Sequence, residues 1–171
     1  LAGNLTIGNM SGGGSGNAVV HLGGDNQIAD SSAIRFDSGN GAASGGNNGN
    51  NGYFKLMGFS DTIRSISDYT ASGVIENMES ELINSSGTLT LNLVGGETAN
   101  YNGFMRNRLG GSGTGVLNLA LTGNGTQWLS LNNISFTGAT TIGAGTGLVL
   151  GNTANFVSDI TNNGTLTYNV S

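Results

Sequence analysis

The acidic residues Glu76, Glu79 and Glu81 form a cluster whose side chains could do chemistry. Carboxylates at this spacing could hold a calcium ion, or act as the pair of acids that cleaves a glycosidic bond. No arginine and no aromatic platform for a sugar lies nearby in the sequence, and charge runs of this kind usually form a solvated face. We therefore interpret the cluster as a solvent-exposed turn.

Asp25 and Asp30 lie in the segment 23–31 (GGDNQIADS), which invites comparison with calcium-binding repeats of the form G-G-x-G-x-D. The pattern occurs once and imperfectly, so we expect these side chains to cap a turn instead. The single histidine, His21, has no second histidine and no cysteine with which to bind zinc. We interpret it as a residue on the surface of a strand, and expect no metal or cofactor.

A third group combines cationic and aromatic side chains. Arg106 and Arg108, with Tyr101, Phe104 and Trp128, could form a patch that faces a carbohydrate. Alternatively, Trp128 covers the edge of a stack of strands. The sequence leaves both interpretations open.

The charge balance excludes several function classes. The formal net charge is −5, and only five residues are basic. Nucleic-acid binding needs a basic footprint, so we expect no nucleic-acid partner. Enzymes that act on polysaccharides need several acidic groups and cations on one face, and the basic residues are too scattered for that. We therefore expect no enzymatic activity. No run of 18 apolar residues exists, so we expect no membrane-spanning helix.

The elements that would position these residues are short strands. Apolar residues alternate with polar ones along the chain, as in Leu89, Leu91 and Leu93, and this period is typical of half-buried strands. The only candidate for a helical turn is the segment 77–84. The predicted strands are 4–7, 18–22, 33–36, 53–57, 62–66, 73–75, 88–94, 115–121, 127–131, 140–142, 147–150 and 165–170.

The composition favours a stack of paired strands over a sandwich or a barrel. Proline is absent although the chain has 32 glycines and many turns, as expected if nearly every strand has two neighbours that need its N–H groups. The segments 87–91 (GTLTL) and 164–168 (GTLTY) resemble each other, which indicates an internal repeat. We predict one domain, residues 1–171, with a flexible Gly/Asn-rich loop at about 39–52.

The segment 129–151 (LSLNNISFTGATTIGAGTGLVLG) resembles the autotransporter-associated β-strand repeat, also called the passenger-associated transport repeat. Segments 23–33, 58–67 and 160–168 are similar to other parts of the unit around that repeat. The resemblance implies an all-β fold, a right-handed parallel β-helix or β-solenoid. It also implies a bacterial protein that is secreted to the cell surface or the extracellular space, commonly an adhesin or a stalk.

Both ends of the chain read as strands without charge. Residues 1–24 and 160–171 contain no Asp, Glu, Lys or Arg, whereas exposed strand edges and repeat stacks are normally protected by charged or polar caps. We predict that the terminal strands join copies head to tail into a filament. The residues expected at this contact are Leu5, Ile7, Leu166, Tyr168 and Val170. Alternatively, the 171 residues are a segment of a longer stack, and the next strands belong to the same polypeptide. A first residue other than Met is compatible with this alternative.

These observations leave two functions in view. The first is a structural extracellular protein whose partner is itself. The second is an adhesin that binds glycans or a host surface through one face of the stack. The absence of cysteine suits passage through an oxidising compartment, because nothing can cross-link on the way.

Overall fold

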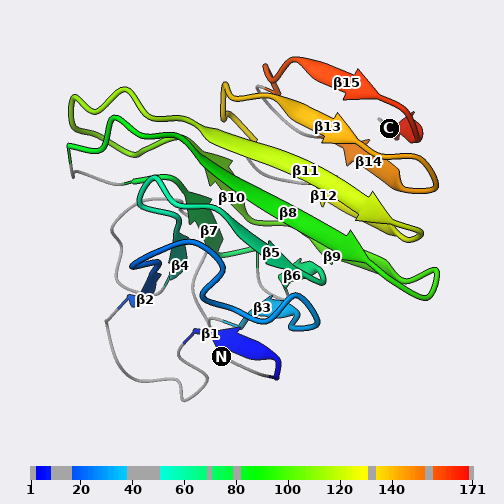
Figure 1. Ribbon diagram of the computed structural model, residues 1–171, viewed down its shortest axis with the longest axis horizontal. Coiled ribbons are helices and arrows are strands. Elements are labelled where there is room, and N and C mark those ends of the chain that lie inside the picture. The colour runs from blue at the N-terminus through cyan, green and yellow to red at the C-terminus, as the bar shows by residue number, and fades with distance from the viewer. Residues whose placement is uncertain are drawn as a thin grey trace.

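The protein is built from parallel β-strands (Figure 1). The computed structural model describes residues 3–8, 17–37, 51–68, 71–78, 82–130, 134–152 and 156–169. These residues form sixteen strands and no helix, and the strands make four sheets in which every pair is parallel. The described residues accordingly contain no helix that could cross a membrane. The all-β prediction is confirmed.

The sheets are named A to D here, and their strands are given in hydrogen-bonded order. Sheet A contains β1 (Leu5–Ile7), β3 (Ile34–Phe36) and β6 (Ile66–Asp68). Sheet B contains β10 (Phe104–Arg106), β7 (Gly73–Glu76), β4 (Gly52–Lys55) and β2 (Ala18–His21). Sheet C contains β15 (Ile160–Asn162), β13 (Thr140–Ile142), β11 (Leu117–Gly123), β8 (Gly87–Leu93) and β5 (Asp61–Ile63). Sheet D contains β16 (Thr165–Tyr168), β14 (Gly147–Gly151), β12 (Thr126–Ser130) and β9 (Thr98–Tyr101).

The chain visits these sheets in a repeating order. From β7 onward it passes through sheets B, C and D, and then through B, C and D again as β10, β11 and β12. Each strand therefore pairs with a strand from the previous or the next cycle, not with its neighbour in sequence. Sheets A and D share one position in this cycle, because β6 of sheet A lies beside β9 of sheet D. The two sheets together are called the A–D column below.

The cycle shortens toward the C-terminal end. Asn107 and Thr137, bonded between neighbouring cycles, are 30 residues apart. Thr140 and Ser158, bonded in the same way, are only 18 residues apart. The shorter cycle has no strand of sheet B among the described residues, since β14 of sheet D is followed directly by β15 of sheet C.

The alternating leucines of the sequence form the core. Leu89 of β8 lies opposite Leu119 of β11, and Leu91 lies opposite Leu121. All of these side chains are at most 1% exposed. Polar residues between them, such as Thr90, are only half-buried and face outward. The period of two is therefore correctly interpreted, and parallel pairing places like residues above one another.

Asparagine side chains join successive cycles at the corners. The Oδ1 atom of Asn107 accepts hydrogen bonds from the backbone N–H groups of Leu117 and Thr137, at 3.1 and 3.2 Å. Asn118 accepts one from Ala139 at 2.9 Å. Corner residues leave the regular ladder, so these amides satisfy backbone groups that would otherwise lack a partner. This explains why the turns are rich in Asn instead of charged residues.

A row of glycines lets the chain turn into sheet B. Gly52 and Gly73 are register partners at the start of β4 and β7, and Gly103 directly precedes β10. A Cβ atom on Gly73 would lie 2.5 Å from Cγ of Phe36, and one on Gly103 would lie 2.3 Å from the carbonyl oxygen of Gly73. These distances are too short for any side chain, so the close approach of backbone to core requires glycine here.

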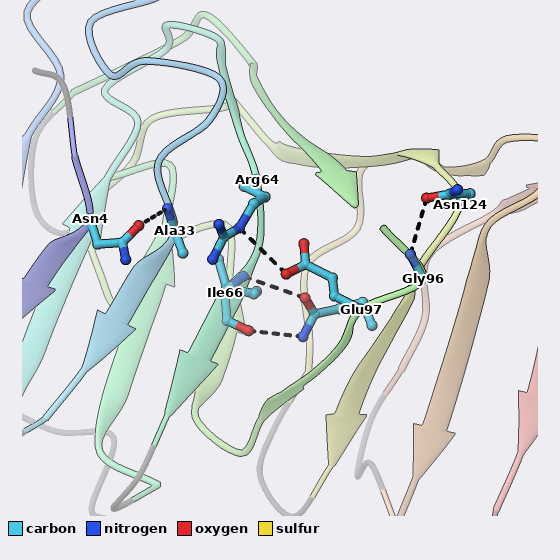
Figure 2. Close-up of polar contacts among 8 residues, drawn as sticks. Asn4, Ala33, Arg64, Ile66, Gly96, Glu97 and Asn124 are labelled. Atoms are coloured by element: carbon cyan, nitrogen blue, oxygen red, sulfur yellow. Dashed lines mark hydrogen bonds and ion pairs between the residues drawn. The ribbon is translucent and has the colours of Figure 1, made fainter. Parts of the chain in front are cut away.

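Sheets A and D meet at a seam that a side chain holds together. Gln127 of β12 is completely buried, and its Nε2 atom donates to the carbonyl oxygen of Ile66 at 3.1 Å. Its Oε1 atom lies 3.4 Å from the N–H donor of the same residue. Figure 2 shows both bonds as the dashed lines that end on Ile66. The side-chain amide thus takes the place of a neighbouring strand for Ile66.

Two predictions about irregular segments are only partly covered by the structure. Residues 77, 78 and 82–84 of the possible helical turn are not helical, and residues 79–81 lie outside the described residues. Residues 39–50 of the expected Gly/Asn-rich loop also lie outside them. Gly52, placed in that loop from the sequence, is the first residue of β4.

Candidate functional site

The strands predicted to join copies lie at opposite ends of the stack (Figure 1). β1 pairs only with β3, and β16 pairs only with β14. Each is therefore an edge strand with no partner on its outer side among the described residues. An unpaired edge offers a row of N–H and C=O groups to another strand.

At the N-terminal end, β1 is held firmly onto the stack. Ile7 is only 2% exposed and belongs to the core, and Leu5 packs against that core from a half-buried position. The N–H group of Leu5 donates to the carbonyl oxygen of Ala33 at 2.9 Å. The Oδ1 atom of Asn4 accepts from the N–H of Ala33 at 3.1 Å (Figure 2). This edge is therefore rigidly presented.

At the C-terminal end, the core is open. Leu166 and Tyr168 of β16 lie in register with Leu148 and Leu150 of β14. The two leucines of β14 are at most 1% exposed, whereas Leu166 is only half-buried and Tyr168 is 63% exposed. The same inward positions are thus buried one strand lower and uncovered in β16. Val170, the fifth residue predicted at the contact, lies outside the described residues.

Segment 23–31 closes the N-terminal edge of sheet C through Asp25 and through its backbone N–H groups. The Oδ1 atom of Asp25 accepts from the N–H of Ser60 at 2.7 Å, so Asp25 caps the next cycle as well as lying in a turn. Asp61 of β5 accepts from the N–H groups of Gln27 and Ile28 through Oδ2, at 2.8 and 3.2 Å. Burial raises the pKa of the Asp61 carboxyl above its ordinary value. Asp61 is not among the site residues predicted from the sequence.

Asp30 and His21 are exposed residues. Among the described residues, no group of three or more acidic, histidine or cysteine side chains could hold a metal ion. His21 does lie on the surface of a strand, β2, as expected.

The interpretation of Glu76 as part of a solvated turn is wrong. Glu76 is the last residue of β7 and is completely buried. Its Oε2 atom lies 2.7 Å from Nε of Arg106, and its Oε1 atom lies 3.7 Å from Nζ of Lys55. Glu79 and Glu81 lie outside the described residues. Glu76 thus belongs to a buried ionic row and not to a solvated face.

Strand register assembles this ionic row. Lys55, Glu76 and Arg106 are cross-strand partners at the ends of β4, β7 and β10. Phe54, Ile75 and Met105, one residue earlier, face the main core, so the ionic row faces the other side of sheet B. A small apolar cluster, Tyr53, Val74 and Phe104, is buried on that same side. Sheet B is therefore covered on both faces, and its charges are structural.

The carbohydrate-facing patch that was one of two interpretations of the sequence does not form. Tyr101 is completely buried, and its hydroxyl donates to the carbonyl oxygen of Phe104 at 2.9 Å. Burial raises the pKa of Tyr101 well above its ordinary value. Arg106 is in the ionic row, Arg108 is exposed, and Trp128 lies half-buried on sheet D. These side chains belong to different faces.

A polar groove of about 690 Å³ lies instead along the outer side of the seam between sheets A and D. Arg64 and Glu97 meet across it, with 3.4 Å between Nε and Oε2 (Figure 2). Both side chains are partly exposed, so the pair is accessible to a ligand. The lining residues are Asn4, Thr6, Ala33, Arg35, Arg64, Ser65, Ser67, Asp68, Glu97, Thr98, Ala99 and Asn100.

Comparisons with known proteins do not identify the chain. No family model matches it, and no curated protein or solved structure gives a significant match.

Proposed function

We propose that the chain is a right-handed parallel β-helix. Three features support this fold. Every strand pair is parallel, the chain returns to the same sheets in a recurring order, and like residues lie above one another between cycles. Crossovers between parallel strands are right-handed in about 98% of cases, which supports the handedness. In such a helix each cycle adds one layer, so the molecule grows along a single axis.

The function proposed is structural: copies stack end to end into a filament or a surface stalk. The observation that carries this is the match between β1 and β16. Both are edge strands of the A–D column, and both offer apolar residues inward and a threonine outward. Stacking β16 under the β1 of another copy would place Leu166 beneath Leu5, and Tyr168 beneath Ile7.

The energetics favour this pairing. Tyr168 is 63% exposed and Leu166 is half-buried, and a further layer would bury both. Burial of apolar surface contributes roughly 25 cal/mol per Å², and new ladder hydrogen bonds would satisfy two open edges. A single strand pair is a small contact, so association should depend strongly on protein concentration.

The proposed location is extracellular, on or near a bacterial surface. A cysteine-free chain can pass through an oxidising compartment without cross-linking. The resemblance of segment 129–151 to a repeat of secreted passengers points the same way. Export can be tested by attaching a reporter enzyme that is active only outside the cytoplasm.

Sedimentation velocity over a range of concentrations, with electron microscopy of the same samples, tests self-stacking. We expect particles that lengthen with concentration. Thr167→Lys, which puts a charge on the β16 edge, should abolish the growth, because lysine on an edge opposes strand addition. Thr141→Lys, an exposed position inside sheet C, is the matched control and should leave growth intact. A single monomeric species at every concentration would contradict the proposal.

A second function, glycan binding as an adhesin module, is supported by the polar groove. Its serine, threonine, asparagine and arginine side chains are hydrogen-bonding groups of the kind that hold sugar hydroxyls. A glycan array tests it. Hits that disappear in Arg64→Ala but persist in Arg108→Ala, an exposed arginine in the turn after β10, would favour this function. An array without hits would remove it.

A further inference from the structure

The two ends of sheet C do not match in the way that the two ends of the A–D column do. At the C-terminal end, β15 is an edge strand that follows Asp159. At the N-terminal end, the edge of β5 is closed by segment 23–31, through bonds from Asn26 to Ser60 and from Gln27 to Asp61. A copy stacked on this end would therefore meet a turn instead of a strand.

Contacts between cycles connect the two acidic residues at these ends. Asp25 accepts from the N–H of Ser60, and the hydroxyl of Ser60 accepts from the N–H of Thr88. Thr88 is the register partner of Asn118, and Asn118 accepts from the N–H of Ala139.

Ala139 precedes Thr140, whose N–H donates to the carbonyl oxygen of Asp159 at 2.8 Å. A single row through sheet C thus begins at Asp25 and ends at Asp159. Both side chains are exposed.

We propose that copies of this chain join through the A–D column alone, and that Asp159 of one copy faces Asp25 of the next across a gap in the sheet C column. This inference rests on the proposed self-stacking. In a stack with continuous registry, the two carboxylates come one layer apart, and like charges directly opposite each other between strands are destabilising. The edge strands of the A–D column, β1 and β16, carry no charge, so this column can join where the sheet C column cannot.

This arrangement makes the contact between copies weak and gives it a characteristic dependence on salt. The two carboxylates repel each other in the sheet C column, while the A–D column attracts. Salt should strengthen the contact, because it screens the repulsion: at 0.15 M ionic strength the screening length is about 8 Å. An ordinary salt-bridged contact behaves in the opposite way. The sign of the salt effect therefore distinguishes this junction.

The test measures the association constant by sedimentation equilibrium in the full chain, at low and at moderate salt. Asp159→Asn should associate about two- to fivefold more tightly than the wild type at low salt, with a weaker salt dependence. Asp159→Lys, which would face Asp25 with opposite charge, should associate more tightly still and should be weakened by salt. Asp25 is left unchanged, because it caps Ser60.

Thr122→Lys is the matched control, because it adds one positive charge on an exposed position of β11, away from both ends. It should leave association unchanged. If the chain associates but Asp159→Asn behaves like Thr122→Lys, the charge row is wrong and self-stacking stands. If no variant and no condition gives association, self-stacking and this inference both fail.

Discussion

The side-chain amide of Gln127 pairs with both backbone groups of Ile66, its Oε1 with the N–H and its Nε2 with the carbonyl oxygen. The same Nε2 atom also lies 3.1 Å from the carbonyl oxygen of Ala99. A side chain of β12 thus supplies hydrogen bonds that a strand would normally supply, where β6 and β9 meet. This buried amide therefore links sheets A and D directly.

Gln127→Leu should therefore lower the free energy of unfolding by roughly 2–6 kcal/mol, because two backbone groups of Ile66 lose their partner inside the protein. Urea unfolding followed by circular dichroism measures it. Gln27→Leu, at an exposed glutamine, is the control and should change stability by less than about 0.5 kcal/mol. Equal stability of the two variants would show that Gln127 does not hold the seam.

Gly103→Ala should destabilise the fold by several kcal/mol, or prevent folding, since its Cβ atom would lie 2.3 Å from the carbonyl oxygen of Gly73. Gly110→Ala is the matched control, because nothing lies within 4 Å of the Cβ atom built there. It should change the melting temperature by at most a few degrees. A Gly103→Ala variant as stable as this control would refute the close approach at the corner.

The ionic row of sheet B should respond to loss of the Glu76 carboxylate. Glu76→Gln keeps the shape of the side chain but removes the carboxylate that contacts Lys55 and Arg106, and breaking a buried pair in this way costs about 3–5 kcal/mol. Asp37→Asn, which breaks the exposed pair between Arg35 and Asp37, should cost less than about 1 kcal/mol. Similar losses in both variants would contradict the burial of the row.

Asp61 should give stability a pH dependence of known sign. Burial raises its pKa in the folded state above the unfolded value of 3.8, so its stabilising contribution is complete below that pH and is lost as pH rises through the folded pKa. Asp61→Asn retains an acceptor for the N–H groups of Gln27 and Ile28. It should be more stable than the wild type at pH 7 and equally stable at pH 3.

Urea unfolding at both pH values checks this prediction, with Asp159→Asn as an exposed control for the change in net charge. A variant at Asp61 that is less stable than the wild type at pH 7 would mean that the two accepted hydrogen bonds outweigh desolvation of the carboxylate.

Much of the fold could be predicted from the sequence, because local alternation determines it. The leucines of β8 and β11 occur with a period of two, and that period alone places them in a core. The lack of charge on the terminal strands could also be predicted, because the sequence of residues 1–24 and 160–171 shows it directly. Gln127 shares a strand face with Leu129, and this alternation was the available signal of its burial.

The partners of buried charges could not be predicted in this way. Glu76 meets Lys55 and Arg106 only because β4, β7 and β10 stack in register. The length of the cycle varies along the chain, from 30 residues between Asn107 and Thr137 to 18 between the register partners Gly147 and Thr165. Without a fixed period, the sequence does not show which residues lie one layer apart, and Glu76 therefore resembled a solvated residue.

Disulfide trapping tests the central claim, the joining of β16 to the β1 of another copy, most directly. The wild type has no cysteine, so Thr6→Cys with Thr167→Cys introduces the only thiols, on the outward positions that stacking would bring together. Under mild oxidation we expect a ladder of covalent oligomers on a denaturing gel that reduction collapses. Thr6→Cys with Thr141→Cys, whose second position lies inside sheet C, is the control and should give no oligomers. Monomers alone from the first variant, at concentrations where the wild type is fully folded, would contradict the account.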